Sequence, residues 1–157
     1  MPTFPARLVT PEEVLLEEDV AAVILRTDVG DATFMPGHTR LIGAIVPGAV
    51  RFQREDGTEV RAAAHGGFVQ VDAEHVVVLA PVAERAADID VERARRALEA
   101  ADERLTELGS PAGAGEAPGG EGERGTLDTR VIEAEGARLR AQVRLEVADA
   151  EHHAVQS

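Results

Sequence analysis

Gly-Asp-Ala-Thr-Phe-Met-Pro-Gly-His, residues 30–38, is the stretch that decides the fold, because it separates two apolar runs with the residues of a turn. Gly30 accepts a positive φ at low cost, Pro36 fixes φ near about −65°, and Gly37 lets the chain reverse at once. We therefore expect a rigid, exposed corner in an all-β domain. Asp31 and His38 are expected to be its polar tips. Phe34 and Met35, which lie between them, are candidates for burial.

Short apolar runs with regular turn signals surround this stretch from Arg7 to Leu79, the pattern of an all-β sandwich or barrel. The clearest pairing is a hairpin of residues 49–54 with residues 59–64 around Asp56-Gly57, since Asp-Gly favours tight hairpin turns. Apolar and charged residues alternate along both arms. One face of this ribbon should be apolar and the other charged.

A second hairpin is predicted from Phe68–Val71 and Val76–Leu79, joined by the turn from Asp72 to His75. Before the corner, Val20 to Thr27 looks like one longer strand. Pro81 is expected to end the sheet region, because proline lacks the amide donor that a central strand needs.

The apolar period changes from 2 to about 3.6 after Ile89, which predicts an amphipathic helix with Asp90 as its N-cap. Its apolar stripe consists of Val91, Ala94, Leu98, Ala101, Leu105 and Leu108. Gly109-Ser110-Pro111 should stop the helix, and residues 109–125, rich in Gly, Ala, Pro and Glu, are expected to form a flexible connector.

A second helix is predicted from about residue 127 to residue 150, with an apolar arc too wide for one contact. One side consists of Leu127, Val131, Ala134, Ala141 and Leu145, and the adjacent side of Ile132, Leu139, Val143 and Val147. The two helices are expected to form an antiparallel hairpin. The fold class is therefore a β-sandwich N-terminal domain followed by a C-terminal two-helix antiparallel hairpin.

Composition excludes several function classes. The net charge of −13 and the low aromatic content of 3% argue against a nucleic-acid partner. The chain has no cysteine, so thiol catalysis and disulfides are excluded, and no apolar run is long enough for a membrane span. Without a basic, apolar leader the chain is expected to be cytoplasmic.

Catalytic chemistry finds little support in the residue types. The chain contains no lysine for a phosphate-binding P-loop, and its serines, Ser110 and Ser157, lie in the connector and at the terminus. His38, His65 and His75 fall in separate predicted turns, without metal-ligand spacing. They leave open a small metal-dependent β-barrel enzyme as a weak alternative, although no metal is expected.

Three ordered motifs, Pro36-Gly37-His38, Pro47-Gly48 and His65 to Val71, carry a family resemblance. Through these motifs the chain resembles the epsilon subunit of bacterial rotary (F-type) ATP synthases, and the resemblance runs from about Thr3 to Leu108. Thr33 stands where that family usually has glycine, and the connector is longer than the family's. The resemblance implies a stalk-docking sandwich domain over residues 1–86 and a two-helix regulatory segment over residues 87–157.

The implied function is that of a non-catalytic central-stalk subunit of a proton-translocating ATP synthase. It would couple the γ subunit to the c-ring and inhibit ATP hydrolysis through its C-terminal helices, which would contact the catalytic α/β subunits. Its place would be peripheral, on the cytoplasmic face of the plasma membrane. The γ and c-ring contacts are expected at Asp31, Pro36, Gly37 and His38.

Ile89-Asp90-Val91-Glu92-Arg93-Ala94 also matches the motif with which some epsilon subunits bind ATP. The resemblance thus implies a regulatory ATP site at Asp90, Arg93 and Ala94, although no cofactor is required. A capped helix start explains the same residues. The sequence leaves open whether helix-two arginines such as Arg138, Arg140 and Arg144 complete a phosphate site, and a free-standing ATP-sensing sandwich module is the alternative function.

Overall fold

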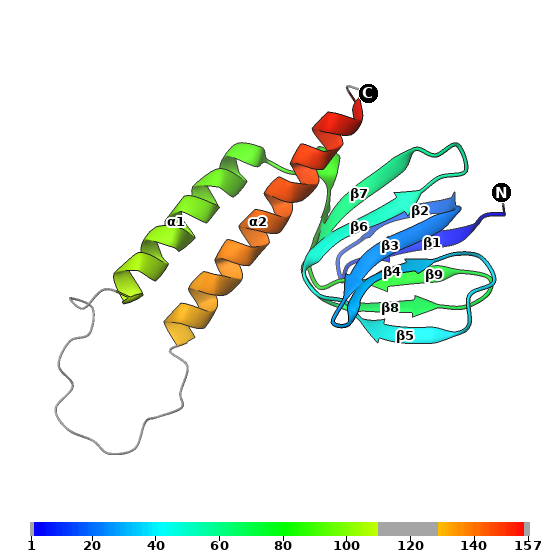
Figure 1. The fold of residues 1–157 in the computed structure, drawn as a ribbon, viewed down its shortest axis with the longest axis horizontal. Helices are drawn as coiled ribbons and strands as arrows, with labels where there is room; N and C mark the ends of the chain where they lie inside the picture. The colour runs from blue at the N-terminus through cyan, green and yellow to red at the C-terminus, as the bar shows by residue number, and fades with distance from the viewer. Residues whose placement is uncertain (1, 110–128, 156–157) are drawn as a thin grey trace, which may run out of the picture. The chain divides into compact units, whose positions relative to one another are not determined.

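The computed structural model describes residues 2–109 and 129–155, so most of the predicted connector, residues 109–125, lies outside the described residues. The chain divides into two compact units. One comprises Met1–Ile89 together with Glu146–Ser157, and the other comprises Asp90–Leu145. The predicted fold class is confirmed, because two β-sheets precede two helices (Figure 1).

The described part of the sandwich contains ten strands in two five-stranded sheets. In chain order they are β1 (Phe4–Val9), β2 (Val14–Val20), β3 (Ala22–Thr27), β4 (Gly30–Phe34), β5 (Leu41–Ala44), β6 (Gly48–Gln53), β7 (Glu59–Ala64), β8 (Phe68–Val71), β9 (Val76–Leu79) and β10 (Ala83–Arg85). Sheet A has the order β2-β1-β9-β8-β5, and sheet B the order β10-β7-β6-β3-β4.

Both predicted hairpins are confirmed. In β6–β7, Phe52 pairs with Val60 and Val50 with Ala62, so the apolar positions share one face as expected. The turn itself spans Arg54 to Thr58, where Asp56 Oδ1 accepts from the Thr58 amide at 2.9 Å. In β8–β9, all four residues of each strand pair in register.

Two strand predictions are wrong. The run from Val20 to Thr27 is not one strand, because the chain bends at Ala21 and passes from sheet A into sheet B. Pro81 does not end the sheet region, since β10 follows it and pairs with β7 at the edge of sheet B. An edge position tolerates a proline nearby, because only one side of the strand needs hydrogen bonds.

Residues 30–38 do not form a single corner, as the sequence predicted. Gly30 to Phe34 is strand β4, paired with β3, and the reversal comes only after it, at Met35 to Arg40. Phe34 is buried as expected, whereas Met35, the other candidate for burial, is 49% exposed. Phe34 is the last residue of β4, whereas Met35 lies after the strand, where the chain begins to reverse.

The sandwich core lies between the two sheets and contains the largest buried side chains of the unit. Phe34 and Phe52 come from sheet B, and Leu8 and Val78 from sheet A. The two facing sheets thus bury their inner side chains against each other, as in other β-sandwiches.

Gly67 explains the double glycine before β8. Its φ is 114°, and a Cβ atom on it would lie 2.0 Å from the Leu79 carbonyl oxygen. At Gly66, φ is 90°, but an added Cβ would meet nothing within 4 Å. Both positions favour glycine by conformation, and Gly67 also requires it by space.

Helix α1 (Val91–Gly109) begins as predicted. Asp90 Oδ1 accepts from the Arg93 amide at 3.0 Å, and the Asp90 carbonyl accepts from the Ala94 amide. A short 3-10 turn, η1 (Ala86–Asp88), precedes the cap. Every residue of the predicted apolar stripe is buried or half-buried, while the intervening residues are exposed. The stripe is therefore confirmed.

Helix α2 (Thr129–Val155) extends five residues beyond the predicted end, and Leu127 lies outside the described residues. On its first predicted side, Ala134 and Ala141 are buried. On the adjacent side, Val143 and Val147 are buried, whereas Ile132 and Leu139 are about half exposed. In the described part of the chain, no helix is long and apolar enough to cross a membrane.

Candidate functional site

The first predicted contact residue, Asp31, lies in β4 directly after the β3–β4 turn. Asp31 stands opposite Arg26 in the register, and Arg26 Nε donates to Asp31 Oδ1 at 2.9 Å. Val29, at the tip of the turn, is 92% exposed, and the Thr27 hydroxyl donates to the Gly30 carbonyl across the turn. The turn is therefore a hydrogen-bonded, acidic tip with one apolar side chain in solvent.

The Pro36-Gly37-His38 loop lies beyond the other end of β4. The Gly37 amide donates to the Ala73 carbonyl at 3.1 Å, which fastens this loop to the β8–β9 turn. The His38 ring lies edge-on to Phe34 at 5.2 Å, and its Nδ1 is 2.7 Å from the Thr39 carbonyl. These contacts within the chain fix the position of the His38 ring.

The four predicted contact residues therefore divide into two groups. Pro36, Gly37 and His38 lie together, but the length of β4 separates them from Asp31. Since a strand rises about 3.3 Å per residue, the separation along β4 is about 10 Å. The predicted single corner with two polar tips is therefore wrong, because β4 keeps Asp31 apart from His38.

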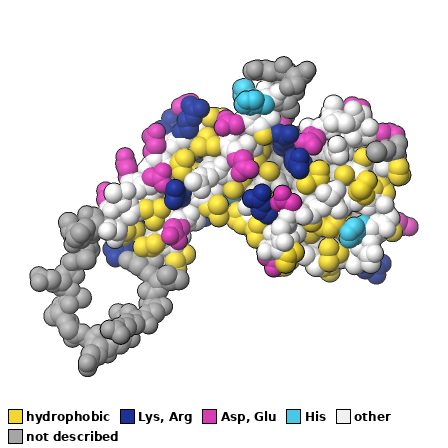
Figure 2. Space-filling model, in the orientation of Figure 1, with side chains coloured by type: hydrophobic (Ala, Val, Ile, Leu, Met, Phe, Trp, Pro, Cys, Tyr) yellow, Lys and Arg dark blue, Asp and Glu magenta, His cyan; other side chains and the backbone are white. Residues whose placement is uncertain are grey.

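The largest unpredicted feature is an apolar row across the outward face of sheet A. Each of the five strands contributes one residue at the same register level: Ala44, Phe68, Leu79, Val9 and Val14. Phe68 is 58% exposed, and Ile42, one row away, is 70% exposed. Figure 2 shows apolar side chains gathered on the surface of the sandwich where β5 lies.

Large exposed apolar patches on soluble domains mark interaction surfaces. The row on the outward face of sheet A is therefore a candidate contact surface. The sequence contains a signal for it in the apolar residues at outward positions of β8 and β9. The row itself could not be found there, since strand order sets which residues become neighbours.

The predicted nucleotide residues lie at the start of α1. The Asp90 carboxylate is engaged as the helix cap, and Ala94 is buried on the apolar stripe. Arg93 is exposed. Of the three, Arg93 is thus the residue with a side chain available for a phosphate.

Two of the helix-two arginines, Arg138 and Arg140, have defined neighbours in the structure. Arg138 Nε donates to Asp102 Oδ1 of α1 at 2.9 Å, which joins the two helices. The Arg140 guanidinium lies back over Gly136, 3.2 Å from where a Cβ of that residue would be.

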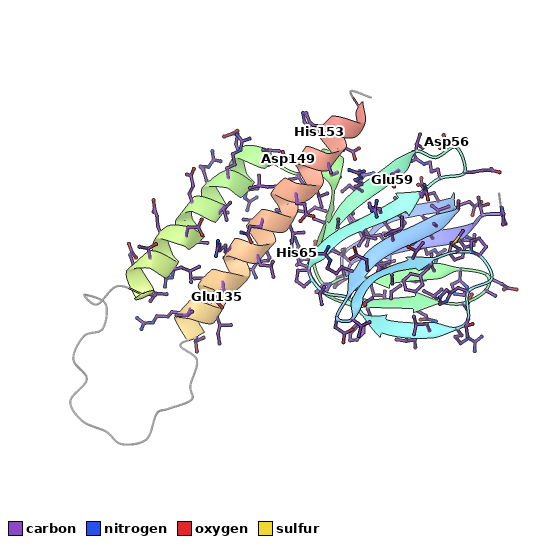
Figure 3. All side chains as sticks on the ribbon, in the orientation of Figure 1. Asp56, Glu59, His65, Glu135, Asp149 and His153 are labelled. Atoms are coloured by element: carbon purple, nitrogen blue, oxygen red, sulfur yellow. The ribbon has the colours of Figure 1, made fainter. Side chains whose placement is uncertain are left out.

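The three histidines of the metal-enzyme alternative lie in different turns. His75 Nδ1 is 2.9 Å from Asp72 Oδ1, and hydrogen bonds from the Glu74 and His75 amides lower the pKa of Asp72. Residue His65 lies beyond the end of β7 (Figure 3). Among the described residues, no three His, Asp or Glu side chains are grouped to hold a metal ion, so nothing here favours that alternative.

Sequence comparison identifies the relatives of the chain. Residues 3–86 match the family model of the ATP synthase delta/epsilon chain, beta-sandwich domain. The chain is 44% identical over 103 residues to the ATP synthase epsilon chain of Desulforudis audaxviator, covering 66% of this chain and 74% of that one. It is 34% identical over 148 residues to the epsilon chain of Bacillus velezensis, covering 94% and 98%.

Solved structures with the same fold come from two mitochondrial complexes. A chain of the Euglena gracilis ATP synthase (OSCP/F1/c-ring) aligns with a TM-score of 0.60 at 22% identity, covering 98% of this chain and 81% of that one. A chain of the Tetrahymena thermophila ATP synthase central stalk and c-ring aligns with a TM-score of 0.52 at 11% identity, covering 92% and 96%. At these identities the likeness concerns the fold.

Proposed function

The chain belongs to the ATP synthase delta/epsilon family, among its bacterial epsilon chains, and we propose that it is a non-catalytic central-stalk subunit of an F-type ATP synthase. In this role it links the γ subunit to the c-ring and sits peripherally on the cytoplasmic face of the plasma membrane. The proposal is supported by the structural neighbours, which are chains of ATP synthase assemblies that contain F1, the central stalk or the c-ring.

The observation that carries the proposal is the apolar row on sheet A. A partner that covered Phe68, Leu79 and Ile42 would remove three large apolar side chains from water, at about 25 cal/mol for each Å² of apolar area. We assign this face to the γ subunit, because a permanent stalk contact needs a large apolar core. The Pro36-Gly37-His38 loop, which leads into β5, would border the same contact.

The β3–β4 turn is a separate contact, which we assign to the c-ring. Its exposed tip combines the acidic Asp28 and Asp31 with Val29. An acidic tip fits basic loops on a partner, and charge complementarity of this kind fixes orientation more than affinity. Two separate surfaces on one rigid sandwich are what a linking subunit requires.

The helices would supply regulation. In the proposed mechanism α2 leaves its compact position and obstructs rotation during ATP hydrolysis, by contact with the catalytic α/β subunits. Arg130, Arg138, Arg140 and Arg144 would meet acidic partner segments. ATP, held by Arg93 near the start of α1, would be a regulatory ligand that favours one position, since a ligand shifts an equilibrium by its differential affinity.

The test is a pull-down of the tagged chain from detergent-solubilised membranes of its source, with bound proteins identified by mass spectrometry. The unchanged chain is expected to recover γ, the c subunit and the catalytic subunits. Phe68→Glu combined with Leu79→Glu should lose all of them, because two carboxylates would be buried in the γ contact.

Val82→Glu is the matched control, since Val82 is also an exposed apolar residue of the sandwich but lies outside the row. It should retain the partners. Loss of partners in the control alone, or full recovery with the double variant, would contradict the assigned face. Recovery of no synthase subunit by the unchanged chain would contradict the stalk role and favour the free-standing ATP-sensing module.

A further inference from the structure

The two sheets of the sandwich end in four edge strands, β2, β5, β10 and β4, and β5 differs from the other three. An edge strand exposes unpaired backbone N–H and C=O groups, which charged residues, prolines or bulges commonly protect from pairing with another chain. Strand β2 has an acidic run at residues 17–19, β4 contains Asp31, and β10 has the sequence Ala-Glu-Arg. Strand β5, with the sequence Leu-Ile-Gly-Ala, has no charged residue and no proline. Its edge, at the lower border of the sandwich in Figure 1, lacks this protection.

The hydrogen-bond ladder of β5 determines which backbone groups face that edge. The Ile45 amide, directly after the strand, donates to the Gly67 carbonyl, directly before β8, at 3.0 Å. Because bonded and non-bonded pairs alternate in an antiparallel ladder, every second residue counted back from Ile45 directs its backbone groups at β8. Ile42 and Ala44 therefore direct theirs away from β8. In the described part of the chain, β8 is the one strand that neighbours β5, so two N–H and two C=O groups face the edge.

The chain itself uses this side for pairing just beyond the strand. The Val46 amide lies on the same side of the backbone as that of Ala44, and it donates to the Arg26 carbonyl of β3 at 3.1 Å. In the described pairing, β3 does not continue along β5. The side that accepts a strand at Val46 is therefore open from Ile42 to Ala44.

Both faces of β5 leave an apolar side chain in solvent. Ile42 stands opposite Gln70 on the outward face of sheet A and is 70% exposed. Leu41 stands opposite the fully buried Val71, so it lies on the inner face, yet it is 41% exposed. A partner on the outward face alone would cover Ile42 but not Leu41. A strand added at the edge would cover both.

We propose that the open edge of β5 binds an extended segment of the γ subunit, which adds a sixth strand to sheet A. The inference rests on the proposed function, which assigns the outward face of this sheet to γ. The edge is continuous with the apolar row, because Ala44 belongs to both. The segment is apolar over the four residues of β5, since a strand covered on both faces is a continuous apolar run.

Ala44→Pro tests the backbone contact, because proline removes the N–H on the open side and edge strands tolerate proline there. Ala44→Val is the matched variant, since it adds as many carbon atoms to the side chain and keeps the N–H. Binding of the purified γ subunit is measured for the parent chain and both variants. Ala44→Pro should bind about tenfold more weakly than Ala44→Val, the upper size expected for one lost backbone hydrogen bond.

Stability measurements separate a lost contact from a lost fold. Ala44→Pro should unfold in urea at nearly the same concentration as Ala44→Val, whereas Gly43→Pro should unfold earlier, because it removes an amide directed at β8. Amide exchange of the parent is a second measurement that needs no variant. The Ile42 and Ala44 amides should exchange rapidly in the free chain and about tenfold or more slowly with γ bound.

Equal binding of Ala44→Pro and Ala44→Val would overturn the edge contact, and so would exchange at Ile42 that γ leaves unchanged. Either result would leave the stalk role intact, since the pull-down tests it separately. A dimer of the free chain that Ala44→Pro abolishes would assign the edge to a second copy and overturn γ as its occupant. Failure of the parent to bind γ at all would contradict the stalk role and this contact together.

Discussion

The sandwich and the two-helix unit bury different kinds of side chain. The sandwich core contains Phe34, Phe52 and Leu8, whereas the helices bury mainly alanines such as Ala101 and Ala141. A buried methyl group contributes about 0.8 kcal/mol, against about 2–3 kcal/mol for a large apolar side chain. The comparison indicates a firm base and a helix pair held by small margins, which suits a docking domain joined to a regulatory segment.

The largest expected effect is a loss of sandwich stability caused by one added atom, the Cβ of alanine at position 67. Gly67→Ala should lower the free energy of unfolding by roughly 4 kcal/mol, because the new Cβ would overlap the Leu79 carbonyl at a φ that alanine disfavours. Gly66→Ala is the control and should cost only about 1–2 kcal/mol, for backbone strain alone. Urea unfolding measures both, and equal losses would show that space at Gly67 is not limiting.

A second prediction compares the two regions directly. Phe52→Ala should cost roughly 4 kcal/mol by loss of burial and cavity formation in the sandwich. Ala101→Gly in α1 should cost about 1 kcal/mol, with faster amide exchange confined to the helices. Equal destabilisation of the whole chain by both substitutions would mean that the helices are as firmly held as the sandwich.

A third, smaller effect concerns the ion pair between the helices. Arg138→Ala removes the contact with Asp102 and should weaken the helix pair by less than about 1 kcal/mol, since both side chains are half exposed. Amide exchange in α1 at low and high salt measures this, and the effect should fade at high salt. Arg140→Ala, which removes an arginine without this contact, should have less effect.

The smallest effect is a pH dependence of the sandwich. The pKa of Asp72 is lowered by hydrogen bonds from the Glu74 and His75 amides and by the charges of His75 and Arg40. A lowered pKa in the folded state gives stability that is present above the unfolded value, 3.8, and is lost as the pH falls below it. Asp72→Asn should remove that part of the acid sensitivity. An unchanged pH profile of unfolding would contradict the assignment.

The hairpins could be predicted from the sequence because their signals are local. Asp56-Gly57 and the alternation beside it lie within one ribbon, and the cap at Asp90 lies next to the helix it starts. Strand β4 was missed because Gly30 and Asp31 look like turn residues, while its pairing with β3 depends on the opposite Arg26.

The apolar row could not be predicted for a different reason. Ala44, Phe68 and Val14 are far apart in the sequence, and only the strand order of sheet A makes them members of one row. Likewise, the sequence grouped Asp31 with His38 by proximity in the chain, although a strand extends that distance instead of closing it. Partner surfaces on a sandwich therefore depend on topology.

The most direct test of the central claim is hydrogen–deuterium exchange of the chain alone and in the purified ATP synthase. If the sandwich is the docking base, protection should increase at β5, β8 and β9, which carry the apolar row, and at the β3–β4 turn. Amides of α2 should continue to exchange faster than those of the sandwich core. Unchanged exchange over sheet A in the complex would contradict the account.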